Sequence, residues 1–547
     1  MVAQLPGVLN DGPQAPAQVV RRILLVFPRY TPSFGTFEYA YALVGAKAFM
    51  PPQGLLVIAA ALPRSWQVRF VDENLRRATA ADFAWAEAVF VSGMHIQRSQ
   101  INDINRRAHA AGRTTALGGP SVSACPDYYP EFDYLHVGEM GDATDALVAR
   151  IAADPSRPVA QTVFTTKVRC DLAKFPLPAY ELAELPKYFM GSIQFSSGCP
   201  YDCEFCDIPA LYGRNPRLKT PEQVCAELDK LRECGLGEAV YFVDDNFIGN
   251  RRAVRELLPA LVAWQKRNGY PYRFACEATL NIAKRPEILE PMRQAQFHTI
   301  FCGIETPEPE ALKAMDKGHN MMVPILEGVA TLNSYGMEVV SGIIMGLDTD
   351  DLDSRERILA FVRASNIPVL TINLLQALPR TKLWDRLAAE GRLVEDEARE
   401  SNVVFRLPYA EVVDSWRACM AEAYDPAALF ARYEHQIQAT YPHRTELPPR
   451  KVTGKDVRRG LKILAKVLWT CGVMAPYRRA FWRFAWPLFK RMDIERVISV
   501  GVVSHHLITF AREASSGRQN ASFYSGKLRE RRGAAPAPSP MDPVKAA

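Results

Sequence analysis

The sequence predicts an α/β protein in three parts: an N-terminal doubly wound parallel sheet, a partial (β/α)6 barrel and a helical C-terminal extension. Strand-like apolar runs alternate with helix-length segments in two successive series, which is typical of parallel sheets. These runs end in polar and glycine residues, and they stop near residue 400. We expect a disordered leader at 1–20, the doubly wound domain at 21–150, a linker at 151–190, the barrel at 191–400, a helical domain at 401–513 and a disordered tail at 514–547.

Composition places the chain among ordinary globular proteins, with 547 residues, 48% hydrophobic and 23% charged. The N-terminus lacks the basic start and apolar core of a signal peptide. No uninterrupted apolar stretch reaches about 18 residues, so no transmembrane helix is expected. Eleven cysteines without an export signal indicate a reducing cytoplasm and thiol or cluster chemistry.

The first series of strands predicts a Rossmann-like sheet. In such sheets ligands bind beyond the C-terminal ends of the strands. The expected strands are residues 21–28, 66–74, 88–94, 114–120 and 134–139. Their ends carry Asp72, Asn74, Ser92, Gly93, Met94, Gly118, Gly119, Gly138 and Glu139. Glycine lets a backbone approach a large flat ligand closely, although tight strand-to-helix turns would use the same residues.

The second series predicts a partial barrel of six βα units, with intervals of about 25 to 45 residues between strands. The expected strands are residues 192–197, 239–245, 272–278, 299–305, 338–346 and 369–377. Barrel enzymes place their chemistry at the C-terminal strand ends. The candidate residues there are Asp244, Asp245, Glu277, Gly303 and Glu305.

The most specific motif is the run CPYDCEFC after the first barrel strand, which contains Cys199, Cys203 and Cys206. Three thiolates so close together can hold three irons of a four-iron cluster and leave the fourth iron open to a small ligand. A structural zinc site is the alternative, but it needs a second ligand pair. Cys225 and Cys234 are separated by eight residues in a helix-like stretch and do not supply one.

The C-terminal region is basic as well as helical. Residues 451–532 hold 18 lysines and arginines against 5 acidic residues. Aromatic residues lie among them, namely Phe481, Trp482, Phe484, Trp486 and Phe489. This pattern predicts either an interfacial helix on an anionic membrane or a helix docked on the barrel, rather than a nucleic-acid site. A membrane-facing set should stay exposed, whereas a docking set should be buried.

The cysteine motif, with Phe205 before its last cysteine, resembles that of the radical SAM superfamily. The resemblance implies a 4Fe-4S cluster on Cys199, Cys203 and Cys206, with S-adenosylmethionine at the open iron. It also implies that Asp244, Asp245, Glu277, Gly303 and Glu305 contact the methionine and ribose parts of that cosubstrate. A sulfonium, an amino group and ribose hydroxyls need carboxylate and backbone acceptors. The pair Asp244-Asp245 could instead cap a helix.

The N-terminal domain resembles the cobalamin-binding domain fused to many radical SAM enzymes. The resemblance implies that Asp72, Asn74, Ser92, Gly93, Met94, Gly118, Gly119, Gly138 and Glu139 surround cobalamin. Some cobalamin proteins use an Asp-x-His-x-x-Gly motif whose histidine ligates cobalt from below. His95, His109 and His136 lack the flanking Asp and Gly. Bound methylcobalamin should therefore have no protein histidine as its lower ligand.

Whole phrases, among them FPRYTPSFGTFEYAY, LGGPSVSACPDYYP and VSGIIMGLDTD, resemble the bacterial radical SAM methylases that act on hopanoid lipids. The resemblance implies methylation of an unactivated carbon, position 2 of the A ring. A 5′-deoxyadenosyl radical would abstract hydrogen, and methylcobalamin would supply the methyl group. It also implies a ferredoxin or flavodoxin donor and a cytoplasmic enzyme that contacts the inner membrane surface. A cobalamin radical enzyme of another type, such as an oxidative cyclase, and a non-enzymatic metal-binding protein remain as alternatives.

Overall fold

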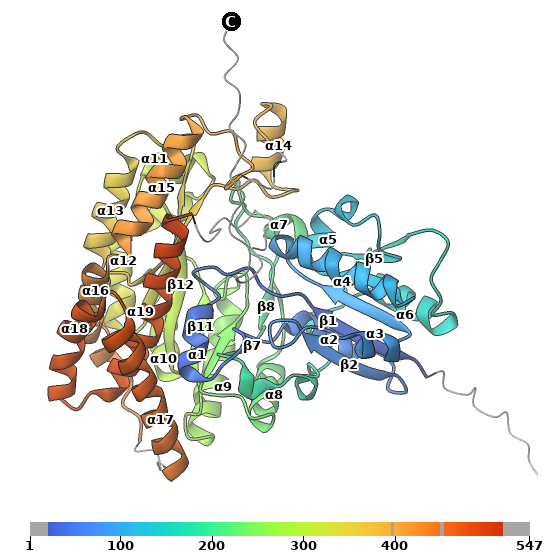
Figure 1. Ribbon diagram of the computed structural model, residues 1–547, viewed down its shortest axis with the longest axis horizontal. Helices are drawn as coiled ribbons and strands as arrows, with labels where there is room; N and C mark the ends of the chain where they lie inside the picture. Colours follow the sequence, from blue (N-terminus) through green and yellow to red (C-terminus); the bar gives the residue numbers. More distant parts are fainter. Residues whose placement is uncertain (1–19, 395, 397–398, 449–452, 518–547) are drawn as a thin grey trace, which may run out of the picture.

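Two parallel six-stranded sheets and a group of C-terminal helices make up the protein (Figure 1). The structure is a computed structural model and describes residues 20–394, 396, 399–448 and 453–517. In Figure 1 the N-terminal sheet (blue) lies at one side, the second sheet (green to yellow) in the middle and the C-terminal helices (orange to red) at the other side. The fold class expected from the sequence is confirmed.

The N-terminal sheet has the strand order β2-β1-β3-β4-β5-β6, with every neighbouring pair parallel. The strands are β1 (Arg22–Phe27), β2 (Gln67–Asp72), β3 (Ala88–Ser92), β4 (Thr114–Gly118), β5 (Tyr134–Val137) and β6 (Thr162–Thr165). The chain leaves β1 in one direction for β2 and then returns to the other side for β3. The order therefore reverses between β1 and β3, which is where doubly wound sheets bind ligands.

Alternation of side chains along β1 explains why helices cover both faces of this sheet. Leu24 and Val26 belong to a core with α3 (Ala80–Trp85), α4 (Arg98–Ala110) and α5 (Pro120–Ala124). Ile23 and Leu25 point to the opposite core, with α2 (Gln53–Ala61) and α6 (Asp142–Ala153). Successive strand residues face opposite sides, so a continuous apolar run fits a sheet buried on both faces.

Strand β6 corrects the expectation that residues 151–190 form only a linker. It pairs in parallel with β5, while residues 151–153 complete α6. The strand has only four residues, and most of its side chains are exposed. Because a short edge strand has no buried apolar face, its sequence lacks the pattern on which the expectation depended.

The second sheet is an open barrel of six parallel strands in the order β14-β13-β12-β11-β10-β7. The strands are β7 (Gly191–Ile193), β10 (Ala239–Phe242), β11 (Arg273–Glu277), β12 (Phe297–Glu305), β13 (Glu338–Met345) and β14 (Val369–Leu374). The intervening helices are α8 (Pro221–Glu233), α9 (Arg251–Arg267), α10 (Pro286–Gln294), α11 (Pro309–Ala314), α12 (Ile325–Ser334) and α13 (Ser354–Ser365). All six expected barrel strands are present, and the first continues into a small hairpin of β8 (Ser196–Ser197) and β9 (Arg217–Leu218).

The C-terminal helices share one hydrophobic core with the barrel and are not a separate body. After α14 (Lys382–Ala389) come α15 (Tyr409–Ala423), α16 (Pro426–Ala439), α17 (Gly454–Val467), a π-helix (Leu468–Met474), α18 (Arg478–Lys490) and α19 (Ile494–Ser515). Helix α15 covers the edge strand β14. Trp416 donates to the carbonyl of Ile372 (2.9 Å), and the amide of Leu370 donates to the hydroxyl of Tyr424 (2.8 Å). Side chains thus satisfy an edge that would otherwise stay open.

Two boundary expectations concern the ends of the chain. Helix α19 runs to Ser515, so the tail expected from residue 514 begins at least two residues too early. The leader at 1–19 and the remaining tail at 518–547 lie outside the described residues.

Among the described helices, α19 alone is long and apolar enough to cross a membrane. Of its most apolar 18-residue stretch, 56% is buried inside the structure.

The aromatic set in α18 is largely a docking set. Phe481 and Phe484 are buried against the helical core, and Trp482 and Phe489 are partly buried. Trp486 is the exception, with 58% of its surface exposed. The docking alternative therefore holds for most of α18, and the exposed apolar side chains of this region lie mainly on α17 and the π-helix.

Candidate functional site

The three cysteines Cys199, Cys203 and Cys206 lie on one loop beyond the hairpin strand β8, with free and partly buried thiols. The amide of Cys206 donates to the carbonyl of Cys203 (3.1 Å), which folds the loop back on itself. Gly198 opens the loop with φ +100°, and a Cβ there would lie 2.8 Å from the carbonyl oxygen of Gly213. Only glycine fits that position, so the loop geometry is set before its first thiol.

Burial raises the pKa of all three thiols and takes that of Cys203 to about 11. Thiols in this state stay protonated until a metal replaces the proton. Within the described part of the chain, no three His, Cys, Asp or Glu side chains converge on one ion. A four-iron cluster binds each thiolate at a different iron, which three thiols on one loop can supply, whereas a structural zinc site needs four ligands on one ion.

The adjacent acids Asp244 and Asp245 follow β10 and accept hydrogen bonds from different segments. Asp244 is 1% exposed and accepts from the amide of Phe195 (3.2 Å) and from the amide and hydroxyl of Ser196. It thereby holds the turn between β7 and β8. Asp245 accepts from the amide of Gly198 (2.7 Å) and also lines a large cavity. Neither acid caps a helix, since α9 begins at Arg251 with Asn250 as its cap.

Glu277 and Glu305 bring further carboxylates to the same end of the barrel. Burial, together with the charge of Asp245, raises the pKa of Glu277 to about 7, and burial raises that of Asp245 to about 6. Glu277 accepts from the hydroxyl of Tyr241 (3.3 Å). A cationic ligand, such as one with the expected sulfonium and amino groups, would stabilise the ionised forms of Glu277 and Asp245.

Lys317 is a buried ammonium group at this site and was not among the residues predicted from the sequence. It forms an ion pair with Glu305, and its Nζ lies 5.3 Å from the centre of the Phe205 ring. Its charge also lowers the pKa of Cys203 against the larger effect of burial. A Cβ on Gly303 would lie 2.8 Å from this ammonium nitrogen, so the glycine makes room for the pair. Lys317 follows α11, in another βα unit from the cysteine loop, and no local motif marks it.

A cavity of about 440 Å³ lies between the ends of the N-terminal strands and the barrel strands β7 and β10. Its size falls within the range of ligand sites. Seven predicted residues line it: Ser92, Gly93, Met94, Gly118, Gly119, Gly138 and Glu139. Gly119 has φ +95°, and a Cβ there would come within 2.4 Å of the Ser92 hydroxyl. The barrel contributes Ser192, Gln194, Ser197, Val243 and Asp245.

Asp72 and Asn74 were predicted for this cavity but do not line it. They follow β2, which lies beyond β1 on the far side of the point where the strand order reverses. Asp72 accepts from the hydroxyl of Tyr188 (2.8 Å) and from the amide of Asn74 (2.8 Å). Asn74 accepts from the amide of Tyr30 (2.8 Å). These two residues hold the segment after β1 in place, and their predicted contact with a ligand stays a prediction.

Histidine contributes to the cavity only through His136 among the described residues. Its Nε2 lies 2.9 Å from the hydroxyl of Thr144, and burial lowers its pKa. His95 and His109 do not line the cavity; His109 lies 3.1 Å from Asp133. The ring of His136 is thus engaged with a neighbouring side chain.

Glu139, which follows β5, links the N-terminal sheet to the hairpin β8–β9 beside the cavity. Its carboxylate accepts from the hydroxyl of Ser197 (3.0 Å) and forms ion pairs with Arg169 (3.1 Å) and Arg217. Buried polar atoms without a hydrogen-bond partner lie nearby, on Arg217 (Nε and Nη1) and on Asn246 (Oδ1). Buried polar groups are normally satisfied, so these atoms fit a site that receives a polar ligand.

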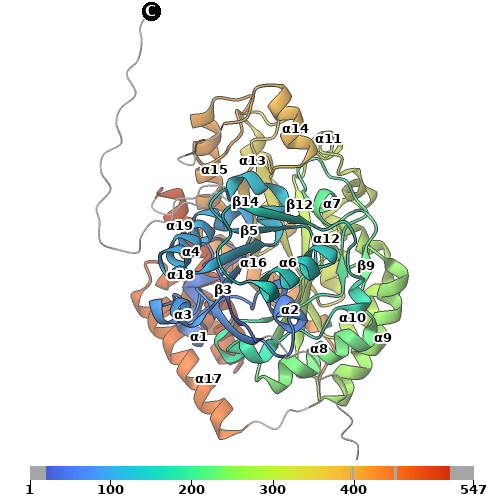
Figure 2. The same ribbon diagram turned by 90° about the vertical axis from the view of Figure 1, so that its right-hand side faces the viewer.

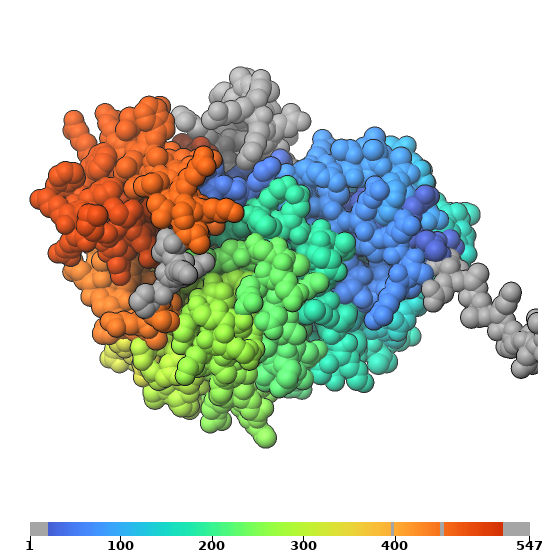
Figure 3. Space-filling model, turned by 90° about the horizontal axis from the view of Figure 1, so that it is seen from below, coloured from blue at the N-terminus to red at the C-terminus, as the bar shows by residue number. Residues whose placement is uncertain are grey.

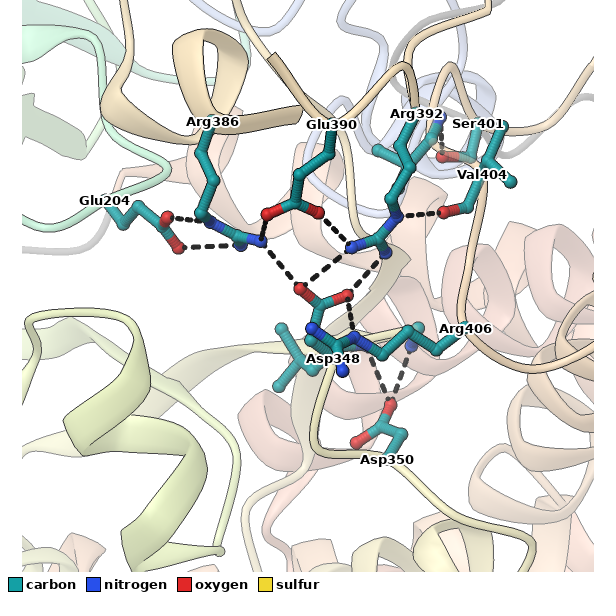
Figure 4. A network of polar contacts seen from close by, with 12 residues as sticks. Glu204, Asp348, Asp350, Arg386, Glu390, Arg392, Ser401, Val404 and Arg406 are labelled. Atoms are coloured by element: carbon teal, nitrogen blue, oxygen red, sulfur yellow. Dashed lines mark hydrogen bonds and ion pairs between the residues drawn. The ribbon is translucent and has the colours of Figure 1, made fainter. Parts of the chain in front are cut away.

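A second cavity, of about 400 Å³, lies beside Phe205 and is bordered by Leu347 and Leu375 after β13 and β14. A charged network forms its rim (Figure 4). Arg386 of α14 donates to both oxygens of Glu204 (2.6 and 3.2 Å) and to Asp348 (2.8 Å).

The network continues through Asp348, whose other oxygen accepts from Arg392 (2.5 Å). Burial alone would raise the pKa of Asp348, but its hydrogen bonds with Arg392 and Arg386 lower it to about 2. Since Glu204 lies between Cys203 and Cys206, the network attaches the cysteine loop to α14 and to the segment after it.

Two family profiles together match most of the chain beyond the N-terminal sheet. The profile described as "Radical SAM superfamily" matches residues 193–362. One described as "Domain of unknown function (DUF4070)" matches residues 381–520, which span α14 to α19.

Among curated proteins, the chain is 64% identical to the "Hopanoid C-2 methylase" of Rhodopseudomonas palustris over 94% of this chain and 98% of that protein. It is 34% identical to an uncharacterized methyltransferase of Synechocystis over 89% of this chain and 92% of that protein. Identity to the "Hopanoid C-3 methylase" of Methylococcus capsulatus is 28%, over 38% of this chain and 40% of that protein.

Solved structures share the fold at low sequence identity. One is the radical S-adenosylmethionine methyltransferase TsrM from Kitasatospora setae with cobalamin and a 4Fe-4S cluster bound (TM-score 0.56, 15% identity, 91% of this chain and 100% of that one). Another is the cobalamin-dependent S-adenosylmethionine radical enzyme OxsB with aqua-cobalamin and S-adenosylmethionine bound (TM-score 0.56, 14% identity, 91% and 80%).

Proposed function

The chain belongs to the hopanoid C-2 methylase family of radical SAM enzymes, and we propose that it methylates carbon 2 in the A ring of a hopanoid lipid. It is a radical SAM C-methyltransferase. The observation that carries the proposal is the 64% identity over 94% of the chain, which includes both sheets and the C-terminal helices. The substrate and the ring position are inferred from that similarity.

The cofactors are a 4Fe-4S cluster, S-adenosylmethionine and cobalamin. When bound, the cluster supplies the electron for S-adenosylmethionine cleavage, and cobalamin supplies the methyl group. In our proposal Cys199, Cys203 and Cys206 hold the cluster. Asp245 accepts from Gly198 at the start of their loop, and Arg386 donates to Glu204 within it. Asp244 holds the turn that precedes the loop.

The acids at the barrel end would bind the cationic cosubstrate. Burial raises the pKa of Asp245 and Glu277, and an added positive charge beside them would stabilise their ionised forms. Glu305 is already paired with Lys317, so it would orient a ligand group while Lys317 offsets its charge. Gly303 would offer only its backbone beside this pair, because a Cβ there would collide with Glu305 and Lys317.

The interdomain cavity would take cobalamin, and the glycines at the ends of β4 and β5 would let a large flat ligand approach the backbone closely. Asp245 and Ser197 line the same cavity from the barrel side, so the two cofactor sites adjoin. The absence of an Asp-x-His-x-x-Gly motif and the engaged ring of His136 favour cobalamin without a protein histidine below the metal.

The remaining partners follow from this chemistry. Reduction of the cluster needs a low-potential carrier, for which a cytoplasmic ferredoxin or flavodoxin is the expected class. A hopanoid is a membrane lipid, so the enzyme would work at the inner membrane surface as a peripheral protein.

The test is an anaerobic assay of the reconstituted protein with desmethyl hopanoid, methylcobalamin, reductant and S-adenosylmethionine. We expect a lipid heavier by one CH2 unit, together with 5′-deoxyadenosine and S-adenosylhomocysteine. An oxidative cyclase would form 5′-deoxyadenosine without S-adenosylhomocysteine or the heavier lipid. Cys203→Ala should lose both the cluster and turnover while the N-terminal sheet stays folded. Normal turnover in that variant would contradict the proposal.

A further inference from the structure

A row of exposed apolar side chains runs along α17 and continues into the π-helix. Val457, Leu461, Trp469 and Val473 recur at intervals of four or eight residues and are 50, 60, 62 and 49% exposed. Residues four apart lie on the same helix face. On another side of the same segment, Val467 and Cys471 are buried in the core. The helix therefore presents an apolar face to the core and a second one to solvent.

Helix α18 extends this exposed apolar area. Trp482 donates its ring N–H to the carbonyl of Gly472 (2.8 Å), which fixes α18 against the π-helix. One turn later, Trp486 is 58% exposed, with the ammonium of Lys490 lying 5.9 Å from its ring centre. We call the exposed residues of this region the α17–α18 surface: Val457, Leu461, Trp469, Val473, Met474 and Trp486 with the basic residues around them.

The basic residues of this surface have no anionic partners within the described structure. Residues 454–491 contain ten lysines and arginines and a single acidic residue, Asp456. Nine of the ten are exposed, and Lys466 donates to the carbonyl of Ala42 (2.6 Å). None of the ten forms an ion pair with a residue that the structure describes. Arginines elsewhere do form such pairs, for example Arg76 with Asp82 (2.7 Å).

We propose that the α17–α18 surface binds an anionic lipid bilayer, an inference that rests on the proposed function because the substrate is a membrane lipid. Exposed tryptophans and aliphatic side chains among cations match the boundary between headgroups and acyl chains. The cations match anionic headgroups, each contributing on the order of 1 kcal/mol near such a surface. Two copies of this surface would repel each other, and a nucleic acid would leave the aliphatic row without a partner.

The position of the surface permits this contact. Figures 1 and 2 both show α17 at the lower edge of the molecule, where it extends beyond the two sheets. Seen from below, the C-terminal helices (orange to red) form one end of the molecule and the N-terminal domain (blue) the other (Figure 3). A bilayer bound there would meet the enzyme through its helical end.

Flotation with lipid vesicles tests the proposal on the full-length protein. The vesicles are phosphatidylcholine alone or three parts phosphatidylcholine with one part phosphatidylglycerol. We expect binding to the anionic vesicles that weakens as salt is added. The double variants Arg458→Glu/Arg459→Glu and Leu461→Ser/Trp469→Ser should each bind at least about tenfold less. The matched controls Arg64→Glu and Leu352→Ser, at exposed sites in other parts of the chain, should bind like the wild type.

The same proteins are assayed for methylation of a hopanoid dispersed in detergent, where no bilayer is needed. Lost vesicle binding with retained turnover supports the proposal. Equal flotation of the wild type with neutral and anionic vesicles overturns it. The proposal is also overturned if the two double variants still bind vesicles but no longer form a dimer, or no longer bind duplex DNA, as the wild type does. If the wild type binds anionic vesicles but methylates no hopanoid, the proposed function fails and the surface assignment stands.

Discussion

Lys317 is the residue through which electrostatics at the cysteine loop can be tested most directly. It is a buried cation between Glu305 and the thiols, whereas Lys382, which also contacts the loop through Asp202 (3.0 Å), is about half exposed. A charge acts more strongly where solvent does not screen it. The two lysines therefore form a matched pair, one buried and one exposed.

Replacing Lys317 by Met should make the reduction potential of the bound cluster more negative, by on the order of 60 mV. Removal of a nearby positive charge disfavours the added electron, and Lys382→Met should shift the potential much less. An electron paramagnetic resonance titration of the reconstituted proteins measures both values. Lys317→Arg keeps the positive charge, so its cluster should have a reduction potential close to that of the wild type. Equal potentials in Lys317→Met and the wild type would exclude this role.

Glu277 predicts how cosubstrate binding depends on pH. Its pKa is raised to about 7 and that of Asp245 to about 6, so both acids lose protons as the pH rises from 5.5 to 8. The ionised acids attract a sulfonium cation, so S-adenosylmethionine should bind more tightly across this range. Isothermal titration of the reconstituted wild type and of Glu277→Gln measures the effect. The variant should bind more weakly and show a smaller gain with pH.

The same carboxylate predicts the stability of the ligand-free protein. A raised pKa means that the folded state holds more protons than the unfolded state between about pH 4.5 and 7, so stability falls as the pH rises through that window. Glu277→Gln should remove this loss, worth at most about 3 kcal/mol. Thermal unfolding at pH 5.5 and 8 should show a smaller difference in Glu277→Gln than in the wild type. The exposed control Glu256→Gln should behave like the wild type.

Local spacing explains which site residues could be predicted. The cysteines are recognisable because their ligand spacing lies within one loop, and Asp245 because it directly follows a strand. Lys317 and Arg386 come from other units of the fold and reach the loop only through tertiary packing, so neither leaves a motif in the sequence. The sequence also could not show that Asp72 and Asn74 lie outside the cavity lining. The strand-end pattern is the same for β2 as for β3, and only the strand order distinguishes the two ends.

At the scale of elements, α14 is the support of the cysteine loop. Arg386 has partners on that loop and on the turn after β13, so three segments meet at one guanidinium. The strands themselves could be predicted because each barrel strand is a buried apolar run. The short strand β6 could not be predicted, because an exposed edge strand leaves no periodic apolar signal. Nor could the contact between α14 and the cysteine loop, because a contact between distant segments leaves no such signal.

Arg386→Met should loosen the loop without unfolding the barrel. Glu204 would lose both of its hydrogen bonds from the guanidinium, and the cluster should become accessible. We expect iron to be lost to a chelator a few times faster than from the wild type, as followed by the decay of cluster absorbance. Arg252→Met, which removes a surface pair within α9 (3.2 Å to Glu256), serves as the control. Identical rates in both variants would show that the network does not protect the cluster.

At the scale of the whole molecule, the shared core makes the C-terminal helices part of the barrel. The barrel sheet is open between β7 and β14, and α15 supplies both apolar cover and hydrogen bonds to its exposed edge. The sequence suggested a helical extension but not this dependence, because the apolar faces of α15 carry no information about which strand they cover. Barrel and helices should therefore unfold together.

Trp416 tests this cooperativity, since it is 1% exposed and bonded to Ile372 of β14. Trp416→Ala should lower the free energy of unfolding by about 3–5 kcal/mol, the cost of a cavity in a packed core. Trp416→Phe retains most of the packing and loses the hydrogen bond, so it should cost less, on the order of 1–2 kcal/mol. Anaerobic denaturation is followed by circular dichroism, which reports the helices, and by cluster absorbance, which reports the barrel. Both signals should move to lower denaturant together in Trp416→Ala. An early loss of helix signal with the cluster transition unmoved would show instead that the extension unfolds independently of the barrel it covers.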